Sequence, residues 1–174
     1  MELSVKDRLL LWNQYSILEA LQPKEADHYK KLKTIVENGY RFHYDDLCPH
    51  IDREEFPEEA AREVIRILGM FEVIQDSVGE EGKVDGVADW VLGFAGFDGN
   101  CEVDQLGYLV FLVEQQERFV HVVKERRYNS HAPLLKRYRE MLGRYQKLGS
   151  PLQLTEDQIR FIASVQENGG GGGA

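Results

Sequence analysis

The chain has 174 residues, of which 43% are hydrophobic and 29% are charged, and its formal net charge is −9. These values are typical of a soluble globular protein and exclude a disordered or fibrous chain. No apolar run approaches the roughly 20 residues that span a bilayer, and the first residues lack the basic start and small-residue cleavage site of a signal peptide, so we predict a cytoplasmic protein with no membrane partner.

A first helix is predicted from Ser4 to about Leu21. Ser4 can accept the hydrogen bonds of the first turn, and apolar residues recur along the segment every three or four positions. Asn13 and Gln14 lie one turn from apolar residues on either side, so we expect both amides to point partly inward. Inward amides need hydrogen-bond partners, which either another helix or a bound ligand would supply.

A second helix is predicted from Pro23 to Gly39, because proline suits a first helical position and glycine commonly ends a helix. The connector at 40–56 shows no sustained period. A third helix begins near Pro57, with glutamates in its first turn. Its expected core face consists of Ala60, Val64, Ile67, Phe71, Ile74 and Val78.

Residues 101 to about 123 are predicted to form the central helix. The β-branched and aromatic run at 108–113 is compatible with a strand, but apolar residues keep helical spacing for more positions than a typical strand contains. A fifth helix opens at Pro133, and a sixth begins with a capping box at Thr155.

These elements predict an all-α fold. We expect an irregular single-domain bundle of about six helices over residues 1–167. The glycine-rich residues 168–174 have no side chains with which to pack, so we predict a flexible tail outside the domain.

The stretch GFAGFDGN at 93–100 raises the question of whether its glycines hold a phosphate. Neither GxGxxG nor GxxxxGK[ST] is present, and Asp98, Glu102 and Asp104 would repel a phosphate at the start of the next helix. We interpret the stretch as a packing turn, in which glycine permits positive φ and close backbone approach. Asp98 is the expected cap of the central helix, and no cofactor is predicted.

Potential metal ligands gather in the connector. They lack the paired spacing of zinc motifs and the central glycine of calcium loops, so no metal site is predicted. The two cysteines are isolated and are expected to stay reduced. The potential ligands are His43, Asp45, Asp46, Cys48, His50 and Asp52.

Charge is distributed unevenly along the chain. Residues 45–104 carry seventeen acids against four basic residues, whereas residues 124–147 carry eight basic residues against two acids. Opposite fields on one molecule favour self-association, so we predict a homo-oligomer formed through charge-complementary faces. The basic segment alone favours DNA binding, and the net negative charge disfavours nucleic acid as a partner.

Five segments resemble the YfbU family in order and spacing. They are NQYSILEALQP at 13–23, YKKLKTIVENGY at 29–40, LGFAGFDGNCEVDQLGYLVFLVEQQERF at 92–119, NSHAPLLKRYREML at 129–142 and LTEDQIRFI at 154–162. The resemblance implies a soluble, all-helical bacterial domain without an assigned activity, joined in some architectures to a helix-turn-helix and therefore suspected of sensing a ligand. It transfers no catalytic residue. The positions that match the family are Asn13, Gln14, Tyr15, Gly39, Tyr40, Gly93, Phe97, Asp98, Gly107, Tyr108, Asn129, Pro133 and Tyr138.

The absence of a catalytic signature favours a non-enzymatic module that senses a small-molecule ligand or binds a protein. Aromatic residues and amides near helix ends and glycines either belong to the core or line a pocket. The candidate ligand-binding residues are Asn13, Gln14, Tyr15, Tyr40, Phe97, Asp98 and Tyr108.

The alternative function is an enzyme that acts on a small anionic substrate. In this hypothesis Glu117 or Asp98 is the general acid or base. Arg118, Arg126 and Arg127 would hold the anion, because guanidinium groups bind carboxylates and phosphates in a bidentate manner. The hypothesis requires a concave pocket that joins these residues.

Overall fold

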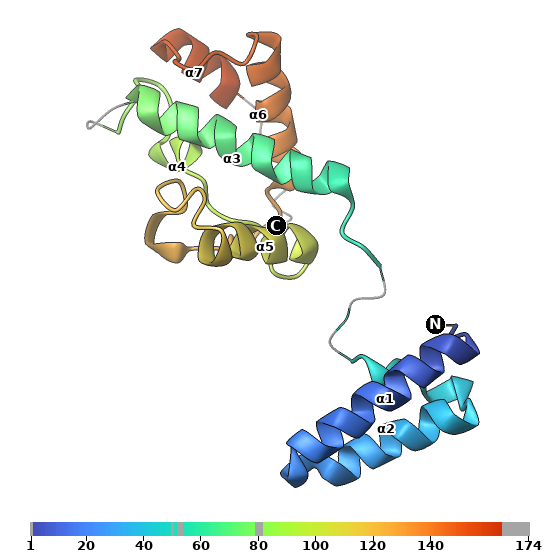
Figure 1. The fold of residues 1–174 in the computed structure, drawn as a ribbon. Coiled ribbons are helices and arrows are strands. Elements are labelled where there is room, and N and C mark those ends of the chain that lie inside the picture. Colours follow the sequence, from blue (N-terminus) through green and yellow to red (C-terminus); the bar gives the residue numbers. More distant parts are fainter. Residues whose placement is uncertain (1, 50, 52–53, 79–81, 165–174) are drawn as a thin grey trace, which may run out of the picture. The chain divides into compact units, whose positions relative to one another are not determined.

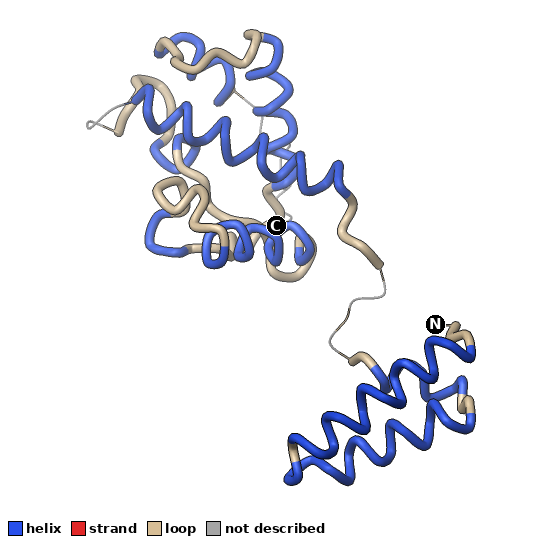
Figure 2. Tube along the Cα trace, viewed as in Figure 1, coloured by secondary structure: helices blue, strands red, loops and turns tan. Residues whose placement is uncertain are grey.

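The structure is a computed structural model that describes residues 2–49, 51, 54–78 and 82–164. The predicted all-α fold is confirmed: across these ranges the secondary structure is helical, and β-pairing is limited to isolated bridges. Figures 1 and 2 show the helices and the loops that join them. The predicted glycine-rich tail lies outside the described residues.

The helices form two compact units rather than packing around one shared core. Unit 1 is Met1–Glu55 and unit 2 is Phe56–Ala174. Each has its own cluster of buried apolar side chains. The two units are therefore described separately.

Unit 1 is a pair of helices followed by a short helical segment. Figure 1 shows α1 and α2 side by side, running in opposite directions. The buried residues Tyr15, Leu32, Val36, Tyr44 and Leu47 form its core. The elements are α1 (Val5–Leu21), the 3₁₀ turn η1 (Pro23–Glu25), α2 (Ala26–Asn38) and the 3₁₀ segment η2 (Arg41–Leu47).

The ends of these helices follow the predicted local chemistry. The Ser4 hydroxyl accepts a hydrogen bond from the Asp7 amide at 3.2 Å, and the Asp7 carboxylate accepts one from the Ser4 amide at 2.9 Å, which completes a capping box. Gly39 ends α2 with φ of +67°, the left-handed conformation that glycine adopts without strain.

Unit 2 is built around α3, which packs against both α5 and α6, while α6 also packs against α7. The predicted core face of α3 is largely confirmed, because Val64, Ile67, Phe71 and Ile74 are buried. The elements are α3 (Glu58–Val78), α4 (Asp89–Leu92), α5 (Val103–Val110), the π-helical turn η3 (Phe111–Gln115), the 3₁₀ turn η4 (Lys124–Arg126), α6 (Leu135–Lys147) and α7 (Glu156–Ala163).

The predicted central helix is shorter than expected. Helical structure runs from Val103 to Gln115 and is followed by irregular turns, in which Glu117 and Phe119 have positive φ. The polar run at 114–118 gives a continued helix no apolar side to bury, so the chain turns instead. The central position in unit 2 belongs to α3.

The glycine stretch is a packing turn, as predicted. The Phe97 amide donates to the Tyr128 carbonyl at 2.9 Å, and the Phe97 carbonyl accepts from the Ser130 amide at 3.0 Å. Gly96 has φ of +98°, and a Cβ atom there would lie 2.2 Å from the Tyr128 carbonyl oxygen. The backbone at residues 127–128 therefore approaches Gly96 so closely that only glycine fits.

We predict that Gly96→Ala lowers the free energy of unfolding by more than about 2 kcal/mol, because the new methyl group meets backbone that cannot move aside. Gly107→Ala is the matched control: Gly107 lies on α5 with open space around its Cα, so alanine should stabilise the helix by up to about 1 kcal/mol. Urea unfolding of both variants measures the difference. Equal effects would show that the close approach does not constrain the turn.

Candidate interaction surface

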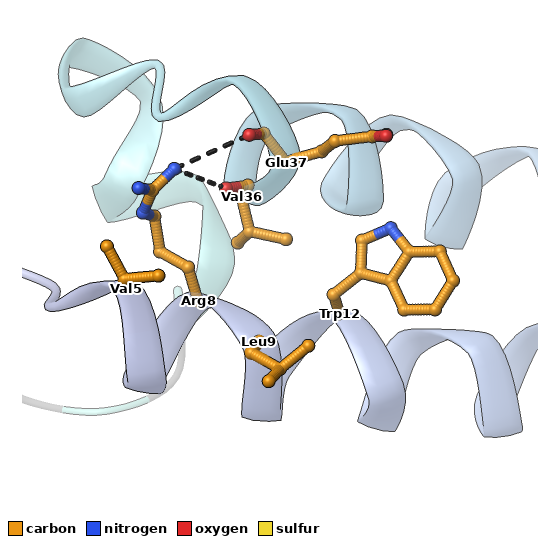
Figure 3. Close-up of a pocket in the computed structure, with 6 residues that line it drawn as sticks. All are labelled: Val5, Arg8, Leu9, Trp12, Val36 and Glu37. Atoms are coloured by element: carbon orange, nitrogen blue, oxygen red, sulfur yellow. Dashed lines mark hydrogen bonds between the residues drawn. The ribbon is translucent and has the colours of Figure 1, made fainter.

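Arg8 joins the two helices of unit 1 at the end of α2. Its Nη1 atom donates to the Val36 carbonyl at 3.1 Å and to the Glu37 carbonyl at 3.4 Å (Figure 3). No basic side chain lies in the last turn of α2 itself. Arg8 therefore supplies from the neighbouring helix the positive charge and hydrogen bonds that a helix C-terminus favours.

A second polar contact lies between the same helices. The Lys33 ammonium group is 2.7 Å from the Glu19 carboxylate, and both side chains are largely shielded from solvent. The ammonium group also lies over the Trp12 ring, 5.1 Å from its centroid. Ion pairs and cation–π contacts are stronger where solvent is partly excluded, so these contacts help to fix which side of α1 faces α2.

Tyr15 lies on the same side of α1 and connects this helix to the end of η2. Its hydroxyl donates to the Leu47 carbonyl at 3.0 Å, and its ring stacks on Tyr29 with centroids 6.5 Å apart. Burial raises the pKa of Tyr15 above its ordinary value. Tyr15 is therefore a structural residue of the unit 1 core.

The opposite side of α1 is apolar and exposed. Leu10 and Ile17 are each 54% exposed, Leu9 is 59% exposed and Leu21 is 72% exposed. Because successive residues are about 100° apart around a helix, these four side chains fall within roughly 120° of one another, on one side of α1. We call the set Leu9, Leu10, Asn13, Ile17, Ala20 and Leu21 the outer face of α1.

The expected inward orientation of Asn13 and Gln14 is wrong, because both side chains are exposed. Apolar and polar residues are mixed around the whole helix, so its period does not determine which side meets the partner helix. Successive residues are about 100° apart around a helix, and Asn13 therefore projects away from the side that carries Tyr15. It lies in the middle of the outer face.

A hollow of about 390 Å³ adjoins the outer face where α1 and α2 meet. Leu9 belongs to both the hollow and the outer face, and Figure 3 shows Leu9, Val5 and Trp12 along α1 beneath the end of α2. The lining is mainly apolar and suits an aliphatic or aromatic group. It consists of Val5, Arg8, Leu9, Trp12, Val36 and Glu37.

The other candidate ligand-binding residues have different surroundings. Tyr40 is 51% exposed in unit 1. In unit 2, Phe97 is completely buried, and Tyr108 packs against Phe56 and Phe111. The candidates are thus divided between the two units, and whether any of them contacts a small molecule stays a prediction.

Asp98 caps a turn rather than the helix expected from the sequence. Its carboxylate accepts from the Asn100 amide at 2.6 Å and the Cys101 amide at 2.9 Å, whereas α5 begins later, at Val103. These backbone hydrogen bonds, from Asn100 first and then Cys101, lower the pKa of the buried Asp98 below its ordinary value. The carboxylate therefore stabilises the turn in its ionised form.

Sequence reasoning missed the role of Glu102. This buried carboxylate accepts from the Asp98 amide at 2.9 Å and from the Leu135 amide, at the start of α6, at 2.6 Å. It thereby joins the glycine turn to α6. The only local signal was an acid four residues after Asp98, which equally suits the start of a helix.

Tyr138 holds the same turn from α6. Its hydroxyl donates to the Gly96 carbonyl at 3.1 Å and accepts from the Ala95 amide at 3.2 Å. Burial raises the pKa of Tyr138 well above its ordinary value, so the phenol stays neutral. Together with Glu102, this side chain makes the turn a rigid part of unit 2.

The residues proposed for the enzyme alternative mostly have local partners. Arg126 lies 3.3 Å from the Glu114 carboxylate, Arg127 pairs with Glu125, and the Arg118 guanidinium lies over the Phe119 ring. Glu117 is exposed. The hollow described above is lined by other side chains, in the other unit.

The connector of unit 1 contains one close pair of potential metal ligands, His43 and Asp46, at 3.1 Å. Two of the other potential ligands named from the sequence, His50 and Asp52, lie outside the described residues. Within the part of the chain that the structure describes, no three side chains of histidine, cysteine, aspartate or glutamate are arranged to hold a metal ion. The described helices are also too short or too polar to cross a membrane.

The fold and surfaces define the chain as an all-α protein of two helical units, one of which presents an apolar helix face. The pattern of the YfbU domain matches residues 1–165. The chain is also similar to the UPF0304 protein MJECS11 of Methanocaldococcus jannaschii, with 32% identity over 170 residues that cover 94% of this chain and 99% of that protein. The chain belongs to the YfbU family, which confirms the resemblance seen in the sequence.

We predict that Glu102→Ala lowers the free energy of unfolding by about 2–3 kcal/mol, because two backbone amides lose their acceptor. Glu102→Gln should cost less, since its amide oxygen replaces one acceptor. Glu140→Ala removes an exposed acid of α6 and serves as the control. Urea unfolding measures all three, and a value for Glu102→Ala within the range of the control would contradict the assigned role.

The lowered pKa of Asp98 predicts a dependence of stability on pH. The ionised carboxylate contributes its full stabilisation above the unfolded-state pKa, near the ordinary 3.8, and this contribution is lost as the pH falls through the lower folded-state value. Asp98→Asn should therefore be less stable than wild type at pH 7, with a smaller difference at low pH. Melting temperatures at both pH values test this, with Asp76→Asn on the surface of α3 as the control. A difference independent of pH would contradict it.

Proposed function

We propose that this chain is a non-enzymatic protein-interaction module that binds its partner through the outer face of α1. The observation that carries the proposal is the exposure of Leu9, Leu10, Ile17 and Leu21 on one side of a single helix. Contiguous apolar side chains on a soluble protein are typical of sites where another protein binds.

The composition of α1 supports the proposal. Helices at the surface of a globular protein are normally polar on the side away from the core, whereas this side of α1 carries several large apolar residues. In unit 1, α2 and η2 cover only the side of α1 that carries Tyr15. A partner that covers the outer face would give α1 the environment that its sequence suits.

The adjoining hollow supports the same surface. Its volume of about 390 Å³ is enough for one or two large apolar side chains of a partner. A volume of this size also suits a small molecule, which makes ligand sensing the second candidate function. The mainly apolar lining, continuous with the outer face at Leu9, favours protein binding.

An enzymatic role has less support. Asp98, one of the two proposed acid–base residues, accepts hydrogen bonds from the backbone of its own turn. Of the three proposed anion-binding arginines, Arg126 and Arg127 pair with neighbouring glutamates. A catalytic role would require these groups to leave their present partners.

We predict that Ile17→Glu together with Leu10→Glu abolishes binding to the partner without unfolding the protein. Both positions are more than half exposed, and substitutions at such positions usually change the free energy of unfolding by less than about 0.5 kcal/mol. Charged groups that would be buried in the complex, by contrast, strongly oppose association. Size-exclusion chromatography with light scattering, of the purified chain and of the chain in extracts of cells that contain it naturally, measures the assembly.

The control is Leu152→Glu, at a residue of unit 2 that is 90% exposed and lies outside the outer face. The wild type and this control should elute as an assembly larger than the 20.1 kDa chain, and the double variant should elute as the single chain. Elution of the wild type as a single chain in both the pure state and the extract would refute the proposed function.

A further inference from the structure

We infer that the partner is a second copy of this chain, and that the two α1 helices pair in opposite directions about a two-fold axis at Asn13. The inference rests on the proposed function, since it uses the same outer face. It adds the identity of the partner, the direction of the helices and their register.

Asn13 lies at the centre of the helix. It is the ninth of the 17 residues of α1, and the apolar residues of the outer face are distributed on both sides of it. In a two-fold interface each residue meets the residue at the symmetric position of the other copy. With the axis at Asn13, the turn around Leu9 and Leu10 meets the turn around Ile17, so apolar groups contact apolar groups.

The amide at the centre suits a two-fold axis. An asparagine side chain carries both hydrogen-bond donors and acceptors, so the two copies of Asn13 can satisfy each other. A single buried asparagine in an otherwise apolar helix seam is also a known means of fixing register. The exposure of Asn13 within unit 1 is explained by this role, because the amide specifies one alignment of the two outer faces.

The charges near the helix ends favour the antiparallel direction. Lys6 lies one turn before the outer face begins, and α1 has no basic residue in its last turn. An antiparallel pair brings Lys6 close to Ala20 of the second copy, at a helix C-terminus that favours positive charge. A parallel pair would instead bring the two copies of Lys6 together, which is unfavourable.

The size of the surface predicts a reversible dimer. A helix of 17 residues is about 25 Å long, and one such face gives an interface near the low end of about 1,200 Å² for specific complexes. The association should therefore depend on protein concentration. Because its contacts are apolar, high salt should not dissociate it, whereas association through charge-complementary faces would weaken.

Disulfide formation tests the register directly. Facing helices pack with axes about 8–10 Å apart, and each Cα atom lies about 2.3 Å from its axis. Directly facing Cα atoms are therefore about 3.4–5.4 Å apart, which overlaps the separation of about 4.4–6.8 Å that a disulfide requires. In the full chain with Cys48→Ser and Cys101→Ser, the variant Asn13→Cys should form a covalent dimer under mild oxidation. Non-reducing gel electrophoresis detects it, and circular dichroism checks that the variant is folded.

Lys6→Cys in the same background is the matched control. Lys6 lies on the same exposed side of α1, and the antiparallel pair places its copies at opposite ends, so this variant alone should remain uncrosslinked. A mixture of Lys6→Cys with Ala20→Cys should give a covalent heterodimer. A Lys6→Cys homodimer would show parallel pairing and overturn the inference, as would failure of Asn13→Cys to cross-link.

Light scattering separates this inference from the proposed function. The purified wild type should be a dimer that persists in 1 M salt, and a purified wild type that stays monomeric at every concentration overturns the inference. If that monomer still enters a larger assembly in cell extract, and Leu10→Glu with Ile17→Glu abolishes the assembly, the partner is another protein and the proposed function stands.

Discussion

A helix buries only the side that its neighbours cover, and α1 is apolar on more sides than unit 1 covers. Three polar contacts together determine which side of α1 faces inward. They are the hydrogen bond from Arg8 of α1 to the end of α2, the Lys33–Glu19 ion pair and the hydrogen bond of the Tyr15 hydroxyl. Once that side is fixed, the outer face is exposed as a direct consequence. The proposed interaction surface thus follows from the contacts between α1 and α2, because these polar contacts determine which apolar residues of α1 stay exposed in unit 1.

In unit 2, side-chain hydrogen bonds hold an irregular segment of backbone in place. The glycine turn is neither helix nor sheet, and Glu102 and Tyr138 supply acceptors and a donor to the backbone of this region. Buried polar groups are stabilising only when their hydrogen bonds are satisfied, and no buried side-chain nitrogen or oxygen in the described residues lacks a partner. Several residues that match the YfbU family, including Asp98 and Tyr138, therefore have a structural reason to be what they are.

The local part of this structure was predictable from the sequence. The caps at Ser4 and Thr155 and the glycine end of α2 depend on residues within one turn, and all three are confirmed. Two features were not predictable: the early end of the predicted central helix, at Gln115, and the outward orientation of the Asn13 side chain. Both depend on which surfaces the rest of the chain covers. Glu102 was missed for the same reason, since its second donor is 33 positions away in the sequence.

The outer face also shows how affinity and specificity can come from different groups. Apolar side chains such as Leu10 and Ile17 supply a non-directional free energy that grows with buried area and would tolerate several alignments. An amide among them adds little to affinity, but leaving it buried without a partner costs about 1–3 kcal/mol, which penalises every alignment except one that pairs it. The charge asymmetry of the sequence need not supply that selection, because basic residues such as Arg126 and Arg139 already pair with glutamates of their own unit. In the proposed dimer, a polar residue at the midpoint of the outer face would therefore select one arrangement among those that the apolar contacts alone allow.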